Sequence, residues 1–295
     1  MLLRYRLVRW VSTPSWMTPY PEGKSTPTLA GDAMFVSKAV SIDAYDATDG
    51  SLCWRRENVG VGTSVNSPAL ISDTLVGSST DRLLAYNPRN GEKKWKYDTG
   101  ETSATVAARD ETVYTLVNAQ KDGDKYGVAS IDPATGDELW RTAGLPESNS
   151  PLVVDDDQIY YAGHRSDVYA LSRRDGTVQW QTPISLPKNG SPSVGVTDEL
   201  VHVQSGIGEF ATLNPNDGRT VWDEPLDTIS SYVPPVVAGA TRFVVEETTL
   251  HAFDATTGDK QWSKGLSSVP AGPLSVVDDA AYIGLKDTGL VRVGD

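Results

Sequence analysis

One nine-residue motif recurs along this chain and limits its possible folds more than any other feature. The motif begins with Asp, Asn or Ser, reaches a glycine four residues later and ends on a tryptophan four residues after that. It occurs six times, as Asp46–Trp54, Asn87–Trp95, Asp132–Trp140, Ser172–Trp180, Asn214–Trp222 and Asp254–Trp262. Successive glycines lie 40 to 45 residues apart, and the motif accounts for six of the eight tryptophans, so the repeat is not a chance arrangement. The chain is therefore a repeat protein with a period of about 40 residues.

The content of one period distinguishes a four-stranded propeller blade from a pair of helices. In residues 150–182, short runs of Val, Ile, Tyr, Leu and Trp alternate with clusters of Asp, Gly and Ser. This pattern predicts four short strands, and no window has the i, i+3, i+4, i+7 spacing of an amphipathic helix. First strands are expected in residues 26–32, 67–73, 104–110, 191–198, 234–240 and 272–279 and at the start of 150–182. We predict an all-β propeller of four-stranded antiparallel blades, with seven blades favoured and eight as the alternative.

The motif combines a turn with an aromatic anchor. Asp and Asn side chains hydrogen-bond to nearby backbone amides, and glycine accepts the positive φ that a tight hairpin with a bulge requires. The first half of the motif is thus expected to join the third strand of a blade to the fourth. The tryptophan then lies on the outermost strand, where it covers the gap to the next blade and donates its indole N–H to a carbonyl there. Burial of such a ring stabilises a fold by about 2–3 kcal/mol. A ligand site lined by these tryptophans is the alternative.

These segments resemble a known repeat. YALSRRDGTVQW (Tyr169–Trp180) and HAFDATTGDKQW (His251–Trp262) are similar to the pyrroloquinoline-quinone (PQQ) enzyme repeat, also called the tryptophan-docking motif. The resemblance covers nearly the whole chain and implies a PQQ-like β-propeller. It is unspecific for function, because the repeat occurs in quinoprotein dehydrogenases, in the scaffold lipoprotein of bacterial outer-membrane assembly, in kinase sensor domains and in archaeal surface proteins.

The last period contains only three strands. Residues 280–286 and 289–295 supply the second and third strands, and the N-terminal segment Leu3–Trp16 has strand-like sequence to spare. We predict that this segment adds the fourth strand of the seventh blade and closes the ring, which removes free sheet edges. The expected domain is a single one over residues 1–295. Trp16, or alternatively Trp10, would take the docking position there, which gives a docking set of Trp16, Trp54, Trp95, Trp140, Trp180, Trp222 and Trp262.

The composition excludes some partners. The formal net charge is −13, from 39 acidic and 26 basic residues, so binding of nucleic acid is not expected. We expect a salt-adapted protein from a halophilic archaeon, with an ordinary acidic protein as the alternative. No apolar run is long enough to span a membrane, and no signal peptide is evident. The family resemblance favours the cell surface or another extracytoplasmic place, and the cytoplasm is the alternative. We expect a monomer.

Catalytic signals are weak. The resemblance implies that an enzyme of this family would use PQQ with Ca²⁺, but no residue here matches the cofactor-binding pattern beyond the repeat itself. No G-x-S-x-G motif occurs, His202 and His251 alternate with apolar strand residues, and the single cysteine, Cys53, is expected to be partly buried filler. We therefore predict no cofactor and no metal, and a non-catalytic scaffold or protein-recognition module with a protein or peptide partner. The alternatives are a PQQ- and calcium-dependent dehydrogenase and the ligand-sensing domain of a larger receptor.

The loops between second and third strands are the expected working surface, because propellers present such loops at one face of the disc. Two of these loops stand out, HRSD (His164–Asp167) and SGIGE (Ser205–Glu209). The candidate residues are His164, Arg165, Asp167 and Glu209. Ordinary turns are the alternative interpretation.

Overall fold

The protein consists of antiparallel sheets. The computed structural model describes residues 27–38, 41–57, 67–100, 102, 105–118, 126–148, 150–163, 167–184, 193–197, 199–204, 209–225, 236–277, 280–285 and 289–293. Over these residues it contains seven sheets and no helix. The first six sheets have four strands each, and the seventh has three.

The strands follow one another in chain order within each sheet. The first sheet contains β1 (Thr28–Ala30), β2 (Ala33–Ser37), β3 (Ser41–Asp46) and β4 (Leu52–Glu57). The second contains β5 (Ala69–Ile71), β6 (Thr74–Ser78), β7 (Arg82–Tyr86) and β8 (Lys93–Asp98). The third contains β9 (Val106–Arg109), β10 (Thr112–Val117), β11 (Tyr126–Ile131) and β12 (Glu138–Leu145). The fourth contains β13 (Val153–Val154), β14 (Gln158–Ala162), β15 (Asp167–Ser172) and β16 (Val178–Pro183).

The same order continues to the C-terminal side. The fifth sheet contains β17 (Ser193–Val196), β18 (Val201–Gln204), β19 (Glu209–Leu213) and β20 (Thr220–Pro225). The sixth contains β21 (Val236–Ala238), β22 (Thr241–Glu246), β23 (Thr249–Asp254) and β24 (Lys260–Gly265). The seventh contains β25 (Pro270–Val277), β26 (Ala280–Leu285) and β27 (Gly289–Val293).

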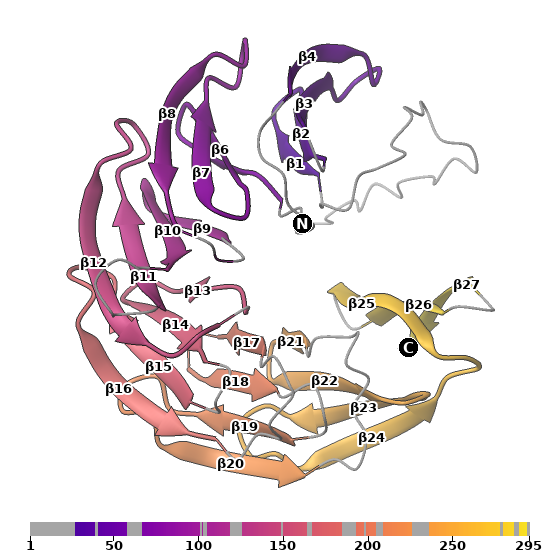
Figure 1. Cartoon of the computed structure of the whole chain (residues 1–295). Helices are drawn as coiled ribbons and strands as arrows, with labels where there is room; N and C mark the ends of the chain where they lie inside the picture. Colours follow the sequence, from indigo (N-terminus) through magenta and orange to yellow (C-terminus); the bar gives the residue numbers. More distant parts are fainter. Residues whose placement is uncertain are drawn as a thin grey trace, which may run out of the picture.

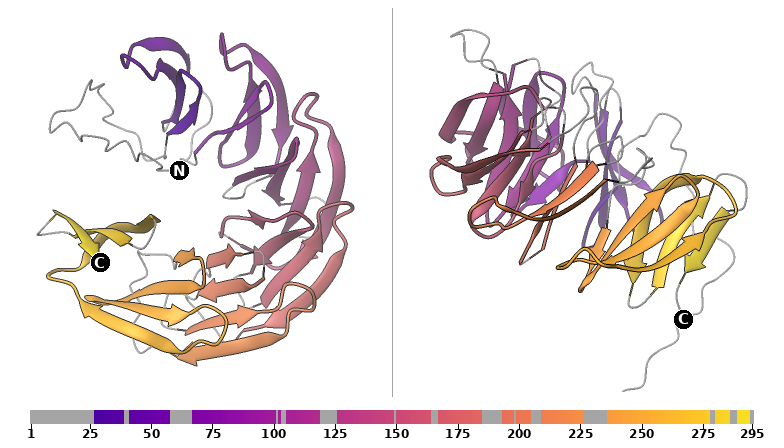
Figure 2. Two further views of the ribbon diagram at one scale, coloured as in Figure 1. Left: turned by 180° about the vertical axis from the view of Figure 1, so that it is seen from behind. Right: turned by 90° about the horizontal axis from the view of Figure 1, so that it is seen from below.

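The sheets are the blades of a propeller. Figure 1 shows them side by side in chain order around a common centre, with the first strand of a blade innermost and the fourth outermost. Figure 2 shows the same succession from behind and from below. Each predicted first strand coincides with one of β1, β5, β9, β13, β17, β21 and β25. The predicted all-β propeller is thereby confirmed, and the described residues form six four-stranded blades and a seventh with three strands.

The core lies between consecutive blades. Innermost strands of neighbouring blades lie side by side, as β5 does with β9 and β9 with β13. Apolar side chains fill the interfaces; between the fourth and fifth blades, for example, Tyr160, Trp180 and Val201 pack together. The cluster between the fifth and sixth blades is small and consists of Val244 and Phe253, with Trp222 against them. Three buried polar side chains, those of His202, Thr212 and Arg242, lie in the same interface.

The motif folds as its residue types require. In the sixth blade the Asp254 carboxylate accepts hydrogen bonds from the backbone amides of Thr256 and Thr257, both at 2.9 Å. Gly258 follows with a φ of +80°, which favours glycine. Its amide donates back to the Asp254 carbonyl at 3.0 Å. The pairing of β23 with β24 has a bulge next to this turn, at Ala252 and Phe253. The tight bulged hairpin predicted from the sequence is what forms.

One expectation is wrong and two stay predictions. Cys53 is exposed rather than partly buried, because neighbouring strand residues point to opposite faces and Trp54 takes the buried face of β4. The prediction that Leu3–Trp16 closes the ring lies outside the described residues. The single domain over residues 1–295 stays a prediction.

Candidate functional site

Five of the tryptophans named from the sequence bridge consecutive blades. Each donates its indole N–H to a backbone carbonyl of the next blade, over 2.7 to 3.1 Å. The pairs are Trp54 with Pro88, Trp95 with Pro133, Trp140 with Arg173, Trp180 with Pro215 and Trp222 with Ala255. The acceptor is always the second residue of the next motif. A tryptophan on one blade and the hairpin of the following blade thus form one unit.

The glycine of each following hairpin lies flat against the same indole. A Cβ added at Gly91, Gly136, Gly176, Gly218 or Gly258 would come within 2.5 to 2.7 Å of the tryptophan ring of the preceding blade. Real Cβ atoms do not approach other atoms so closely, so only glycine fits at this point of the hairpin. A glycine is therefore required here by the close contact with the indole as well as by the positive φ predicted from the sequence.

Two further tryptophans were named from the sequence. Trp262 stands at the same position of β24, but its side chain is 37% exposed and contacts Phe243 of its own blade, with ring centroids 5.9 Å apart. Its indole N–H has no acceptor among the residues that the structure describes. Trp16 lies outside the described residues.

The predicted face loops are only partly visible. His164 and Arg165 lie outside the described residues. Asp167 is the first residue of β15, where its carboxylate accepts a hydrogen bond from Gln181 at 3.2 Å. Glu209 is the first residue of β19. Asp167 and Glu209 therefore occupy corresponding positions of consecutive blades at the end of the second-to-third-strand loops, and their role there stays a prediction.

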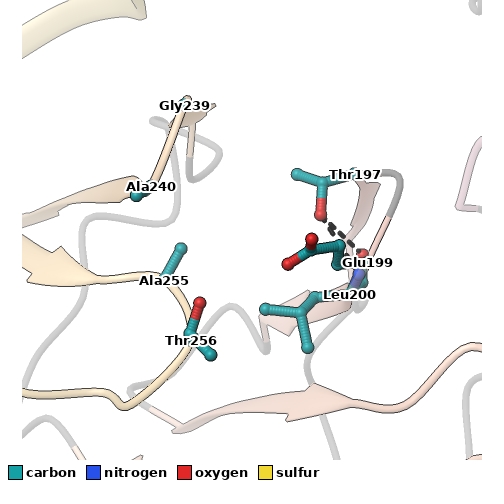
Figure 3. A pocket seen from close by; sticks show the side chains of 7 residues that line it. All are labelled: Thr197, Glu199, Leu200, Gly239, Ala240, Ala255 and Thr256. Carbon is teal, nitrogen blue, oxygen red and sulfur yellow. Dashed lines mark hydrogen bonds between the residues drawn. The ribbon is translucent and has the colours of Figure 1, made fainter.

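A pocket that the sequence analysis missed lies between the fifth and sixth blades. Its volume is about 320 Å³. One wall is the turn between β17 and β18, and the other is formed by two turns of the sixth blade (Figure 3). The lining residues are Thr197, Glu199, Leu200, Gly239, Ala240, Ala255 and Thr256. Turns between first and second strands and between third and fourth strands share one end of a blade, so the pocket opens on the face opposite to the predicted loops.

The pocket combines one carboxylate with a small apolar floor. Glu199 is exposed, and Figure 3 shows its carboxylate extending toward the sixth blade. Leu200 and Ala255 are buried and contribute methyl groups. The Thr197 hydroxyl accepts the Leu200 amide at 3.1 Å, which holds the turn that carries Glu199 in place. The arrangement suits a ligand with a cationic end and an aliphatic part.

A buried cation lies in the same interface. Arg242 of β22 is fully buried, with its guanidinium 5.6 Å from the ring centre of Trp222. It lies 3.2 Å from the Thr212 hydroxyl and 3.4 Å from Nδ1 of His202. Burial, together with the charge of Arg242, lowers the pKa of the His202 imidazole to about 3. His202 is therefore neutral at physiological pH, and it is a buried structural residue, as its alternation with apolar neighbours had indicated.

The described residues give no sign of a metal centre. Within them, His, Cys, Asp and Glu side chains nowhere gather in a group of three or more that could hold a metal ion. No helix of this part of the chain is long and apolar enough to cross a membrane. The pocket is consequently the candidate site. The signal that could have revealed it is the second residue of the motif, which is Ala255 here and proline in three of the other copies.

Known proteins resemble this chain over most of its length. Outer membrane protein assembly factor BamB of Burkholderia pseudomallei is 26% identical over 265 residues, covering 80% of this chain and 64% of that protein. The chain thus spans slightly less than two thirds of this relative. The tetrathionate hydrolase of Acidithiobacillus ferrooxidans is 24% identical, over 82% of this chain and 49% of that protein.

Solved structures show the same fold. The crystal structure of BamB from Moraxella catarrhalis superimposes with a TM-score of 0.75 at 17% identity, covering 94% of this chain and 84% of that one. A europium-containing methanol dehydrogenase follows with a TM-score of 0.63 at 15% identity, over 88% of this chain and 72% of that one. The family model described as outer membrane protein assembly factor BamB matches residues 12–182 and 165–293. This chain, with its seven blades and its tryptophan-to-hairpin contacts, therefore belongs to the family of outer membrane protein assembly factor BamB.

Proposed function

We propose that this chain is a non-catalytic propeller scaffold that binds another protein. The observation that carries the proposal is membership of the assembly-factor family over both halves of the chain, residues 12–182 and 165–293. The name of that family describes a role in assembling other proteins, and the same membership supports an extracytoplasmic place.

The build of the molecule fits this role. Five indole N–H groups fasten consecutive blades, so the turns that line the pocket are carried by blades that are already joined to their neighbours. Binding to such a surface requires little ordering of the protein, which leaves more of the interaction energy for affinity. The pocket at Glu199 and Thr256 is an open recess on one face of the propeller, and its walls belong to two such joined blades.

Site-specific crosslinking tests the proposal. A photo-crosslinking residue is placed at Thr256 on the pocket face, at Asp167 on the opposite face and at the exposed Val178 of β16 on the outer edge as a control. We expect one discrete adduct from one face and none from Val178, and the purified partner should bind the full chain saturably. Equal adducts from all three positions, or none, would refute the scaffold role.

A further inference from the structure

The pocket lies at a position of the blade interface that an arginine side chain occupies in another interface of the same chain. Ala255 and Arg173 are the second residues of their motifs. The carbonyl of Ala255 accepts the indole N–H of Trp222 at 3.1 Å, and the carbonyl of Arg173 accepts that of Trp140, also at 3.1 Å. The two residues therefore hold equivalent positions, one between the fifth and sixth blades and the other between the third and fourth.

The backbone confirms the equivalence. The amide of Ala255 donates to the carbonyl of Ala240, at 2.8 Å, in the turn between β21 and β22. The amide of Arg173 donates to the carbonyl of Asp157, at 2.9 Å, in the turn between β13 and β14. Asp155–Asp157 and Ala238–Ala240 are thus corresponding turns.

The Arg173 side chain is bound as a ligand would be. Its Nη2 lies 3.0 Å from a carboxylate oxygen of Asp110, which belongs to the first turn of the preceding blade. Its Nη1 donates to the carbonyls of Asp155, at 3.0 Å, and Asp156, at 2.5 Å. Its Nε lies 3.2 Å from the Tyr114 hydroxyl, and the side chain is only 13% exposed. One carboxylate, two turn carbonyls and one tyrosine hydroxyl therefore hold the guanidinium in this interface.

The interface between the fifth and sixth blades has the corresponding turns but lacks the arginine. The side chain of Ala255 ends at Cβ, and the pocket begins there. A carboxylate, that of Glu199, also lies on the first turn of the preceding blade (Figure 3). It stands one position later than Asp110 does in its turn, because Thr197 and Leu200 flank the turn as Arg109 and Thr112 do in the third blade. Gly239, which corresponds to Asp156, lines the pocket, and a Cβ added to it would meet nothing within 4 Å. The space for a guanidinium and a carboxylate to pair with it are thus present, without a side chain at this motif position to use them.

We propose that this pocket binds an arginine side chain presented by a partner protein. The partner follows from the proposed scaffold role, whereas the arginine follows from the comparison with Arg173. The guanidinium would pair with Glu199 and with the carbonyls of the Gly239 turn, and its aliphatic part would lie on Leu200 and Ala255. The net charge of −13 attracts a cationic partner to this surface. The buried cation Arg242 does not line the pocket. Glu199 is the one charged residue among the described residues that line it, so its carboxylate would be the counter-charge of the bound guanidinium.

The first test uses a capped Gly-Arg-Gly peptide and the full chain labelled with ¹⁵N. We expect saturable changes in the amide chemical shifts of Glu199, Ala255 and Thr256. The Kd should be in the millimolar range, which corresponds to a binding free energy of about 4 kcal/mol. A peptide with citrulline in place of arginine has the shape without the charge and should produce no shifts there. Equal shifts with both peptides, shifts elsewhere only, or none at all would overturn the proposal.

Two variants, each of which removes one negative charge, separate specific binding at the pocket from the effect of net charge. Glu199→Gln should weaken the arginine peptide about tenfold. Glu111→Gln removes a carboxylate from the corresponding turn of the third blade, where Glu111 lies 3.3 Å from the Ser72 hydroxyl, and should leave the affinity unchanged. Equal weakening by both changes would mean that only the net charge matters, and would overturn the site.

Exchange of the two equivalent residues gives the decisive test. Ala255→Arg should fill the pocket from within and abolish peptide binding. Arg173→Ala should open a second pocket beside Asp110 and raise the number of bound peptides from one to two. If Ala255→Arg does not fold, the second site in Arg173→Ala and the loss in Glu199→Gln still decide the question.

The same variants separate this proposal from the scaffold role. A partner captured equally well by the wild type, Glu199→Gln and Ala255→Arg would overturn the pocket and leave the scaffold. A chain that binds the arginine peptide but crosslinks to no protein would overturn the scaffold and leave the pocket. If the wild type forms a dimer that Ala255→Arg dissociates, the arginine belongs to a second copy of this chain. That result would overturn the proposal that a different protein presents it.

Discussion

Gly136 of the third blade lies against the indole ring of Trp95 of the second, so closely that a Cβ on the glycine would be 2.7 Å from Cγ of the tryptophan. The contact joins residues from two copies of the motif. The glycine of one copy makes room for the tryptophan of the copy before it, and the carbonyl of Pro133 accepts the indole N–H at 2.8 Å. The repeat is therefore a device for fastening one blade to the next as well as for turning the chain.

Gly136→Ala should destabilise the protein by two effects. The φ of +80° costs an alanine about 1 kcal/mol, and the contact with Trp95 adds about 1–3 kcal/mol. Gly144→Ala is the matched control, because Gly144 has a φ of +83° and nothing within 4 Å of an added Cβ. Urea unfolding of both variants measures the difference, and equal losses would show that the indole contact does not constrain the glycine.

Trp180→Phe should lower the free energy of unfolding by about 1–2 kcal/mol. An aromatic ring stays, but it is smaller than the buried indole, and the carbonyl of Pro215 loses the N–H that it accepts at 2.7 Å. Trp262→Phe changes the same position of the sixth blade, where the side chain is 37% exposed, and should cost less than about 0.5 kcal/mol. Chemical unfolding measures both values. A Trp262→Phe loss as large as that of Trp180→Phe would contradict the assigned difference in docking.

His202 should make the protein less stable in acid. Its pKa is about 6.5 in the unfolded chain, and burial beside Arg242 lowers it to about 3 in the folded one. Between these pH values the unfolded state binds one proton more, so stability is complete above the upper value and falls as the pH drops toward the lower one, by about 1.4 kcal/mol per unit at most. His202→Gln should remove this slope. Unfolding of both proteins from pH 7 to 4 measures it, and parallel curves would contradict the lowered pKa.

Residues before Pro19 should stabilise the whole ring, because we expect Trp16 to dock on the hairpin that contains Gly50. That glycine has a φ of +75°, like its counterparts in the other copies of the motif. Deletion of residues 1–18 should lower the melting temperature. A double-mutant cycle of Trp16→Ala and Gly50→Ala should show coupling as large as that of Trp95→Ala and Gly136→Ala. An unchanged melting temperature, or additive effects, would contradict closure by the N-terminal strand.

PQQ should not bind. The titration is made with and without Ca²⁺ in high-salt buffer, and tryptophan fluorescence and heat are followed. We expect no saturable signal, because no residue of this chain matches the cofactor-binding pattern beyond the repeat. Calcium-dependent binding at micromolar affinity would favour the dehydrogenase over the scaffold and would justify assays of alcohol or sugar oxidation.

The period alone determined much of this protein. Tryptophans and glycines at 40- to 45-residue intervals specify the blades, the bulged hairpins and the strand that carries each indole. These features are local, since turn chemistry and strand alternation act over a few residues. The sequence therefore predicted the seven blades and the residues that fasten most of them.

Tertiary structure decided which interfaces are filled. Arg173 and Ala255 hold the same position in their motifs, and the sequence shows only that one side chain is long and the other short. In the fold, Arg173 reaches Asp110, 63 positions away, whereas Ala255 leaves a pocket beside Glu199. Trp262 likewise has the sequence context of its counterparts and stays exposed. In each case the result depends on what a different blade places opposite the residue, and no pattern within a single period contains that information.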